Sequence, residues 1–192
     1  MTQVGQISTS RIGTDALVGP TALAQLGTAS LLVRLGMPFV QGGTKLLAPV
    51  LGSAAREGAM KAVVLTVLRR TLIAATTFSV AAAFAGFFFG PGLLGFVFDE
   101  SVAPGRLTAA IVIGSAGLLY SSMYLGQVLV ALQQSDSLGH AAVAGMVVTA
   151  VLLVPLALVA VVEGSAIALA AGYVARLVVT ARATFASTST LN

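Results

Sequence analysis

Three long windows of this chain contain no charged side chain. No Asp, Glu, Lys or Arg occurs between Arg70 and Asp99, between Arg106 and Asp136, or between Asp136 and Glu163. The hydrocarbon core of a bilayer is about 30 Å thick, and a helix needs about 20 predominantly apolar residues to cross it. Each window is therefore long enough to hold one membrane-spanning helix.

The composition argues against a water-soluble domain. Hydrophobic residues make up 57% of the chain and charged residues 8%, whereas soluble domains contain about 25% charged residues. The apolar runs are continuous and rich in Ala, Leu and Gly, without the alternation of a barrel strand, which favours helices. Cysteine is absent, so no disulfide, thiolate nucleophile or cysteine-based metal site is expected. The sequence predicts an all-α integral membrane protein.

The charge-free windows and the apolar N-terminal third together predict about five transmembrane helices. The first is expected to be long and kinked, because it contains prolines and two cations. A basic amphipathic connector is predicted at residues 56–70, and polar tails are predicted at residues 1–15 and 187–192. The bundle then covers residues 16–186, and the predicted spans are 16–49, 71–98, 107–132, 138–162 and 165–185.

Lysine and arginine are distributed unevenly between the predicted loops. They are concentrated in the connector, whereas the loop after the second span holds Asp99, Glu100 and a single Arg106. Positive charge marks the cytoplasmic side of a membrane, which predicts a multi-pass protein with its N-terminus outside and its C-terminus inside. The Glu163-Gly164-Ser165 stretch is then a tight external turn between the last two spans. An odd number of spans that begins outside suggests a further helix upstream.

The order of features resembles a known family. The similarity is carried by three stretches, TALAQLGTASLLVRLGMPFVQGGTKLLAPVLGSAAREGAMKAVV, FAGFFFGPGLLGFVFDESVAPGRLTAAIVIGSAG and VPLALVAVVEGSAIALAAGYVAR. They resemble segments of the polysaccharide and lipid-linked oligosaccharide flippases in the multidrug/oligosaccharidyl-lipid/polysaccharide exporter superfamily. The resemblance covers about residues 15–185. It departs from the family where Val-Glu-Gly-Ser-Ala replaces a Gly-hydrophobic-x-Gly-Ala hairpin and where Asp99-Glu100 replaces Phe-Gly.

This resemblance implies a fold and a function. Family members are built from two pseudo-symmetric bundles of about six helices, and the chain would supply helices two to six of one bundle. The implied activity is the flipping of a lipid-linked saccharide, such as a polysaccharide, O-antigen, teichoic acid or peptidoglycan precursor, across the cytoplasmic membrane by alternating access. The expected partners are the bilayer, this lipid-linked saccharide and the missing bundle, with no cofactor and no nucleic acid. The alternative is a small helical membrane protein with a structural or partner-stabilising role, and multidrug efflux is a weaker one.

A first group of candidate binding residues lies in the first predicted span. Arg34, Gln41 and Lys45 lie seven and then four residues apart, so they form one stripe on a continuous helix. A charge at membrane depth normally faces an aqueous cavity or a partner. The stripe could therefore bind the pyrophosphate of a lipid-linked sugar, or the two cations could reach the cytoplasmic headgroups as interfacial anchors.

A second group lies in the later spans. Tyr120, Tyr124 and Gln127 share a helix face and could contact a sugar, or they could bond a neighbouring helix. Arg176 in the last span is either a further substrate ligand or an interfacial cation. The Gly86-Phe-Phe-Phe-Gly90 motif is a weak signal for close helix packing.

Enzymatic activity is not expected. No GxxxxGK[ST] loop occurs in the chain, which argues against a P-loop nucleotide site. Every acidic residue lies in a predicted loop or at a span end, so no Ser-His-Asp triad or carboxylate pair can be assembled, and no catalytic or metal-binding residue is predicted. The same distribution argues against the proton site of a cation-drug antiporter.

Overall fold

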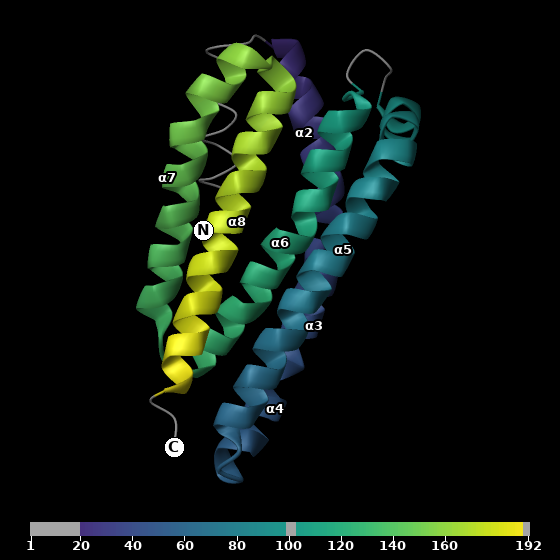
Figure 1. Cartoon of the computed structure of the whole chain (residues 1–192). Coiled ribbons are helices and arrows are strands. Elements are labelled where there is room, and N and C mark those ends of the chain that lie inside the picture. The colour runs from purple at the N-terminus through teal and green to yellow at the C-terminus, as the bar shows by residue number, and fades with distance from the viewer. Residues whose placement is uncertain (1–19, 99–102, 190–192) are drawn as a thin grey trace.

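The computed structural model describes residues 20–98 and 103–189, and all the secondary structure in these ranges is helical. The predicted all-α fold is therefore confirmed, whereas the predicted tail 1–15, the start of the first span, Asp99 and Glu100 lie outside the described residues. The helices are α2 (Pro20–Leu35), α3 (Met37–Lys45), α4 (Leu47–Arg56), α5 (Met60–Val97), α6 (Arg106–Ala131), α7 (Ser135–Val159) and α8 (Val161–Thr188) (Figure 1).

Within the described ranges, α5, α6, α7 and α8 are long and apolar enough to cross a membrane. They overlap the second to fifth predicted spans. Their packing order is α5, α6, α8, α7, and α2, α3 and α4 follow one another along the bundle beside α6 (Figure 1). The α4–α5 turn, the α6–α7 turn and the end of α8 lie at the same end of the bundle, which we call the basic end because Arg56, Lys61 and Arg182 are there.

Most of the predicted connector belongs to helix α5. The sequence places a separate segment at residues 56–70, but the chain reverses at Gly58, which has a φ of +67°, and one helix then runs from Met60 to Val97. Arg69 and Arg70 mark where the apolar region begins, but they do not interrupt the backbone hydrogen bonds. At 1.5 Å per residue, α5 is about 57 Å long, so its basic first turns can extend beyond an apolar slab of about 30 Å.

In place of the first predicted span, the structure has three short helices, α2, α3 and α4, which we call the broken rod. The breaks at Gly36 and Leu46 precede Pro38 and Pro49, and proline cannot supply the N–H that would bond the carbonyl four residues earlier. These carbonyls belong to Arg34 and Lys45. The local sequences Arg34-Leu-Gly-Met-Pro38 and Lys45-Leu-Leu-Ala-Pro49 share one pattern. A cation therefore occupies the last turn of α2 and of α3, where it interacts favourably with the helix dipole.

The turn between α7 and α8 lies before the predicted one. Ala160 is extended, with φ −148° and ψ 96°, and Glu163-Gly164-Ser165 is already within the first turns of α8. A Cβ at Gly164 would overlap the carbonyl of Leu156 in α7. The glycine is therefore needed for the close approach of the two helices and not for the reversal of the chain.

Small residues and hydroxyls line the contacts of α6. Ser115 and Ser122 donate hydrogen bonds to carbonyls of their own helix at 2.7 Å, so these buried hydroxyls need no partner on another helix. A Cβ at Gly86 of α5 would lie 2.8 Å from the Ala109 carbonyl oxygen of α6, and one at Gly90 would lie 2.8 Å from the Ala109 Cβ. The Gly86–Gly90 motif is thus confirmed as a site of close helix packing.

Candidate functional site

The structure divides the predicted Arg34, Gln41 and Lys45 stripe between two helices. Arg34 ends α2, whereas Gln41 and Lys45 belong to α3 beyond the break at Gly36. All three side chains are exposed, and none of them lines a described cavity. Their shared face is therefore an outer surface of the broken rod.

Arg34 and Lys45 differ in their depth along the bundle. The Tyr120 hydroxyl of α6 donates a hydrogen bond to the carbonyl of Val33, and Tyr120 lies near the middle of α6. Arg34, the next residue, is therefore at mid-bundle. Lys45 lies 11 residues further along the rod, which corresponds to about 16 Å of helix, towards the basic end.

The Tyr120 contact fixes the α2–α3 break. Val33 is in the last turn of α2, where carbonyls lack partners within the helix, and the Tyr120 hydroxyl supplies one of the missing donors. A Cβ at Gly36 would overlap the Tyr120 ring, so this glycine makes room for the contact. Of the two roles predicted for Tyr120, the structure displays the bond to a neighbouring helix.

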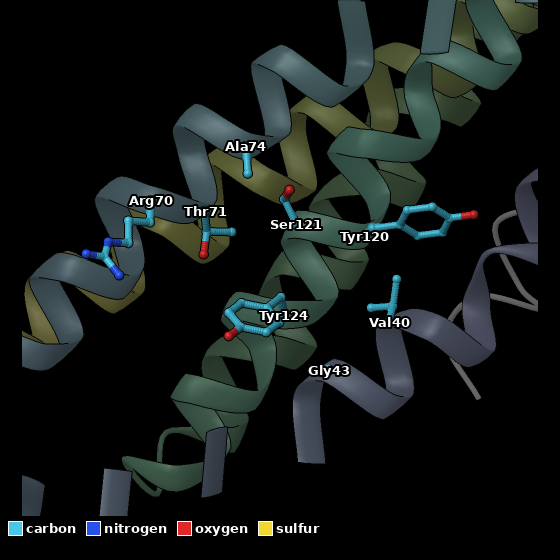
Figure 2. A pocket seen from close by; sticks show the side chains of 8 residues that line it. All are labelled: Val40, Gly43, Arg70, Thr71, Ala74, Tyr120, Ser121 and Tyr124. Atoms are coloured by element: carbon cyan, nitrogen blue, oxygen red, sulfur yellow. The ribbon is translucent and has the colours of Figure 1, made fainter. Parts of the chain in front are cut away.

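A cavity of about 340 Å³ lies between α3, α5 and α6, and we call it the tyrosine cavity. Figure 2 shows that its two tyrosines leave α6 in different directions, Tyr120 towards the broken rod and Tyr124 towards the gap beside α5. No hydrogen bond of the Tyr124 hydroxyl is found within the described part of the chain. The cavity is lined by Val40, Gly43, Arg70, Thr71, Ala74, Tyr120, Ser121 and Tyr124.

Arg70 was not predicted as a site residue, because it lies at the end of the predicted connector. In the structure it belongs to α5, where Arg70 and Ala74 are four residues apart and line the same cavity. The available signal was the absence of any Gly or Pro between residues 59 and 85, which favours one uninterrupted helix.

The remaining predicted residues, Gln127 and Arg176, lie in a second cavity of about 250 Å³ between α6, α7 and α8. We call it the arginine cavity, and it is lined by Met123, Gly126, Gln127, Leu138, Gly139 and Arg176. Arg176 is only 7% exposed, and its Nη1 is buried without a hydrogen-bond partner in the described part of the molecule. Gln127 is thus separated from Tyr120 and Tyr124, although the three were predicted to share one face.

A third cavity, of about 350 Å³, lies between the first turn of α7 and the last turns of α8 and includes His140 and Arg182. Neither it nor the other two cavities contains a carboxylate. No cluster of His, Asp or Glu that could hold a metal ion is found among residues 20–98 and 103–189. The polar groups that the described cavities offer are guanidinium, hydroxyl, imidazole and amide groups, which can bind an anion or a hydroxylated ligand.

Comparisons with known proteins do not identify this site. The chain matches no protein-family model, no curated protein and no solved structure. The resemblance to the exporter superfamily therefore stays a prediction.

Proposed function

We propose that α5 to α8 cross the cytoplasmic (inner) membrane and that the chain is a segment of a transporter. The membrane placement is supported by an inverted distribution of apolar residues. The two most hydropathic long helices, α5 and α7, have only 11% and 28% of their most apolar windows buried, compared with 67% and 56% in α6 and α8. A protein folded in water buries its most apolar surface, so the exposed helices fit a hydrocarbon solvent.

The proposed orientation places the basic end in the cytoplasm. Arg56 and Lys61 lie at the α4–α5 turn, and Arg69 and Arg70 follow in α5, which matches the positive charge of cytoplasmic loops. Reporter fusions after Arg56 and between α5 and α6 should therefore report opposite sides, with the first one inside. Two fusions on the same side would show that α5 does not span the membrane.

The transport proposal rests on the depth of Arg34. It is an exposed cation at mid-bundle with no carboxylate partner in the described ranges. A cation at the bilayer centre costs about 2.5–3.5 kcal/mol on insertion scales, and such residues almost always face a bundle interior or a water-filled cavity. The outer surface of the rod at Arg34 is therefore proposed to face an aqueous cavity that a second helical bundle completes, and not lipid tails.

The chemistry of this surface suits an anionic amphiphile. Arg34 can bind a phosphate group through two parallel hydrogen bonds, whereas Lys45 can act as a mobile cation nearer the basic end. Broken helices at membrane depth are tolerated where they line a cavity, and transporters place substrate sites on them. The proposed substrate is a lipid-linked saccharide with a pyrophosphate, and the rod made of α2, α3 and α4 would move against the missing bundle in alternating access.

Arg34→Gln tests the proposal in cells that make the complete transporter. Glutamine keeps polarity and most of the length but removes the cation and its two-pronged donor, so export of the lipid-linked saccharide should fall at unchanged membrane abundance. Arg34→Lys should give an intermediate rate because the charge remains. The matched control is Arg69→Gln, which removes an exposed cation that lines no described cavity and should leave export unchanged.

The same experiment distinguishes the alternative function. A structural or partner-stabilising protein is favoured by the Tyr120 bond to Val33, which uses a predicted substrate ligand to hold two helices together. On that hypothesis Arg34→Gln lowers abundance and export in proportion, because the cation pairs with a partner protein. Full export by Arg34→Gln at equal abundance would refute the transport role of Arg34.

A further inference from the structure

The Arg176 guanidinium is buried without a counter-charge. Its side chain is 7% exposed, and Nη1 has no hydrogen-bond partner in the described part of the bundle. The described carboxylates, Glu57, Asp136 and Glu163, lie at helix ends, and none of them lines the arginine cavity. Burying an unpaired charge is strongly unfavourable, so a group from outside the described residues is needed to neutralise it.

The arginine cavity opens next to the buried guanidinium at a defined depth. Leu138 and Gly139 line it and lie about one turn, or 5 Å, from the start of α7 at Ser135. The α6–α7 turn is at the basic end, so in a bilayer this cavity lies close to the headgroups of one leaflet. Its volume of about 250 Å³ is below the roughly 300–1,000 Å³ of clefts for drug-sized ligands, which suits one small polar group.

We infer that the arginine cavity binds the phosphate of an anionic phospholipid. The planar guanidinium of Arg176 matches a phosphate with two parallel hydrogen bonds, and the Gln127 amide on the same cavity offers a further donor. The first turn of α7 adds the positive end of a helix dipole. Asp136, in that same turn, is exposed and does not line the cavity. The site needs membrane placement but not transport, so it holds whether or not the chain moves a saccharide.

Native mass spectrometry of the purified full chain in a mild detergent tests this site. The probes are phosphatidylglycerol, diacylglycerol with the same acyl chains, and inorganic phosphate. The wild type should retain one phosphatidylglycerol and no diacylglycerol, and Arg176→Gln should weaken retention by about ten-fold or more, which is the loss expected for a charge-assisted hydrogen bond. The control is Arg69→Gln, which removes an exposed cation of α5 that lines no described cavity. This variant should retain the lipid like the wild type.

A second variant leaves the charge in place and fills the cavity. A Cβ at Gly139 meets no heavy atom within 4 Å, so Gly139→Leu is expected to fold and to exclude the headgroup. Its control is Gly52→Leu in α4, where a Cβ also meets nothing within 4 Å and no described cavity is affected. If Arg176→Gln does not fold, Gly139→Leu decides the question.

The inorganic phosphate probe distinguishes a lipid headgroup from a free phosphate ion as the ligand of the arginine cavity. Retention of phosphatidylglycerol in millimolar inorganic phosphate supports a lipid site, whereas full displacement of the lipid by inorganic phosphate overturns the lipid assignment and indicates a free-anion site. Retention of diacylglycerol to the same extent as phosphatidylglycerol overturns the phosphate requirement. Wild-type lipid retention by both folded variants, Arg176→Gln and Gly139→Leu, overturns the site as a whole.

Discussion

The outer helices α5 and α7 and the inner helices α6 and α8 use opposite kinds of residue. On the outer pair, large apolar side chains are exposed, including Phe84 at 63% and Phe96 at 90%. On the inner pair, buried polar side chains are frequent, and they include Thr108, Ser115, Ser121, Ser122, Ser165, Arg176, Thr180 and Thr184. The inner pair therefore buries many polar side chains, whereas the outer pair exposes many large apolar ones.

In the proposed membrane placement, this contrast follows from what each pair of helices contacts. Lipid tails are as apolar as leucine, so burying leucine between membrane helices gains little, and close contact between small residues becomes the main source of attraction. A hydroxyl such as that of Thr180, which donates to the Arg176 carbonyl at 2.8 Å, costs little in such a contact because its own helix satisfies it. On this placement, the inner pair is adapted to close packing and the outer pair to a hydrocarbon solvent.

The strongest test of the contrast is a charge on the outer surface. Phe84→Arg places a cation near the centre of the charge-free window of α5, where insertion scales predict a cost of about 2.5–3.5 kcal/mol. We expect a large loss of full-length chain from the membrane fraction that resists alkaline extraction. If α5 were in water, the same substitution would be neutral or would improve solubility.

Phe96→Arg is the matched control for depth. Phe96 is even more exposed than Phe84 but lies at the end of α5, where a long basic side chain can reach the headgroups. Its effect should be much smaller. Equal losses for the two variants would contradict the placement of the bilayer around α5.

The contact between an outer and an inner helix should be nearly as sensitive. Gly86→Leu brings a side chain against the backbone carbonyl of Ala109, from which its Cβ would be only 2.8 Å away, so α5 and α6 must separate at a cost of about 1–3 kcal/mol. Unfolding in mixed micelles of a mild detergent and sodium dodecyl sulfate, followed by circular dichroism, measures this loss.

Gly92→Leu is the control on the same helix, because a Cβ there meets no heavy atom within 4 Å. The variant should unfold at nearly the wild-type detergent ratio. If Gly86→Leu were as stable as Gly92→Leu, the close α5–α6 packing would not contribute to the stability of the bundle.

Helices α5, α6 and α7 could be predicted from the sequence because each corresponds to a charge-free window long enough for one continuous apolar helix. The helix ends could not, since charges mark where the apolar region stops and not where backbone hydrogen bonds stop. For this reason α5 begins at Met60 although the predicted span begins at residue 71. The α7–α8 turn was misplaced because Gly164 was interpreted as a turn residue, whereas it permits contact with Leu156.

The candidate site was only partly predictable. Helical spacing grouped Tyr120, Tyr124 and Gln127 on one face, but α6 has neighbours on several sides, and these neighbours divide the face between two cavities. The burial of Arg176 likewise depends on tertiary contacts that spacing along one helix does not reveal. The two breaks of the rod were readable in principle, because Arg34-Leu-Gly-Met-Pro38 and Lys45-Leu-Leu-Ala-Pro49 repeat the same local pattern.

The smallest expected effect concerns a single hydrogen bond that ties the inner pair to the broken rod. Tyr120→Phe removes the hydroxyl that donates to the Val33 carbonyl but keeps the ring, whose centroid lies 6.2 Å from that of Phe78. Hydrogen bonds between membrane helices contribute about 0.6 kcal/mol on average, so the unfolding midpoint should shift slightly but measurably. Tyr124→Phe is the control, since no bond of its hydroxyl is found among the described residues, and it should not shift the midpoint. If the two variants were equally stable, the Tyr120 bond would not hold the α2–α3 break in place. The close contact of Gly36 with the Tyr120 ring would then have to account for the packing of the break against α6.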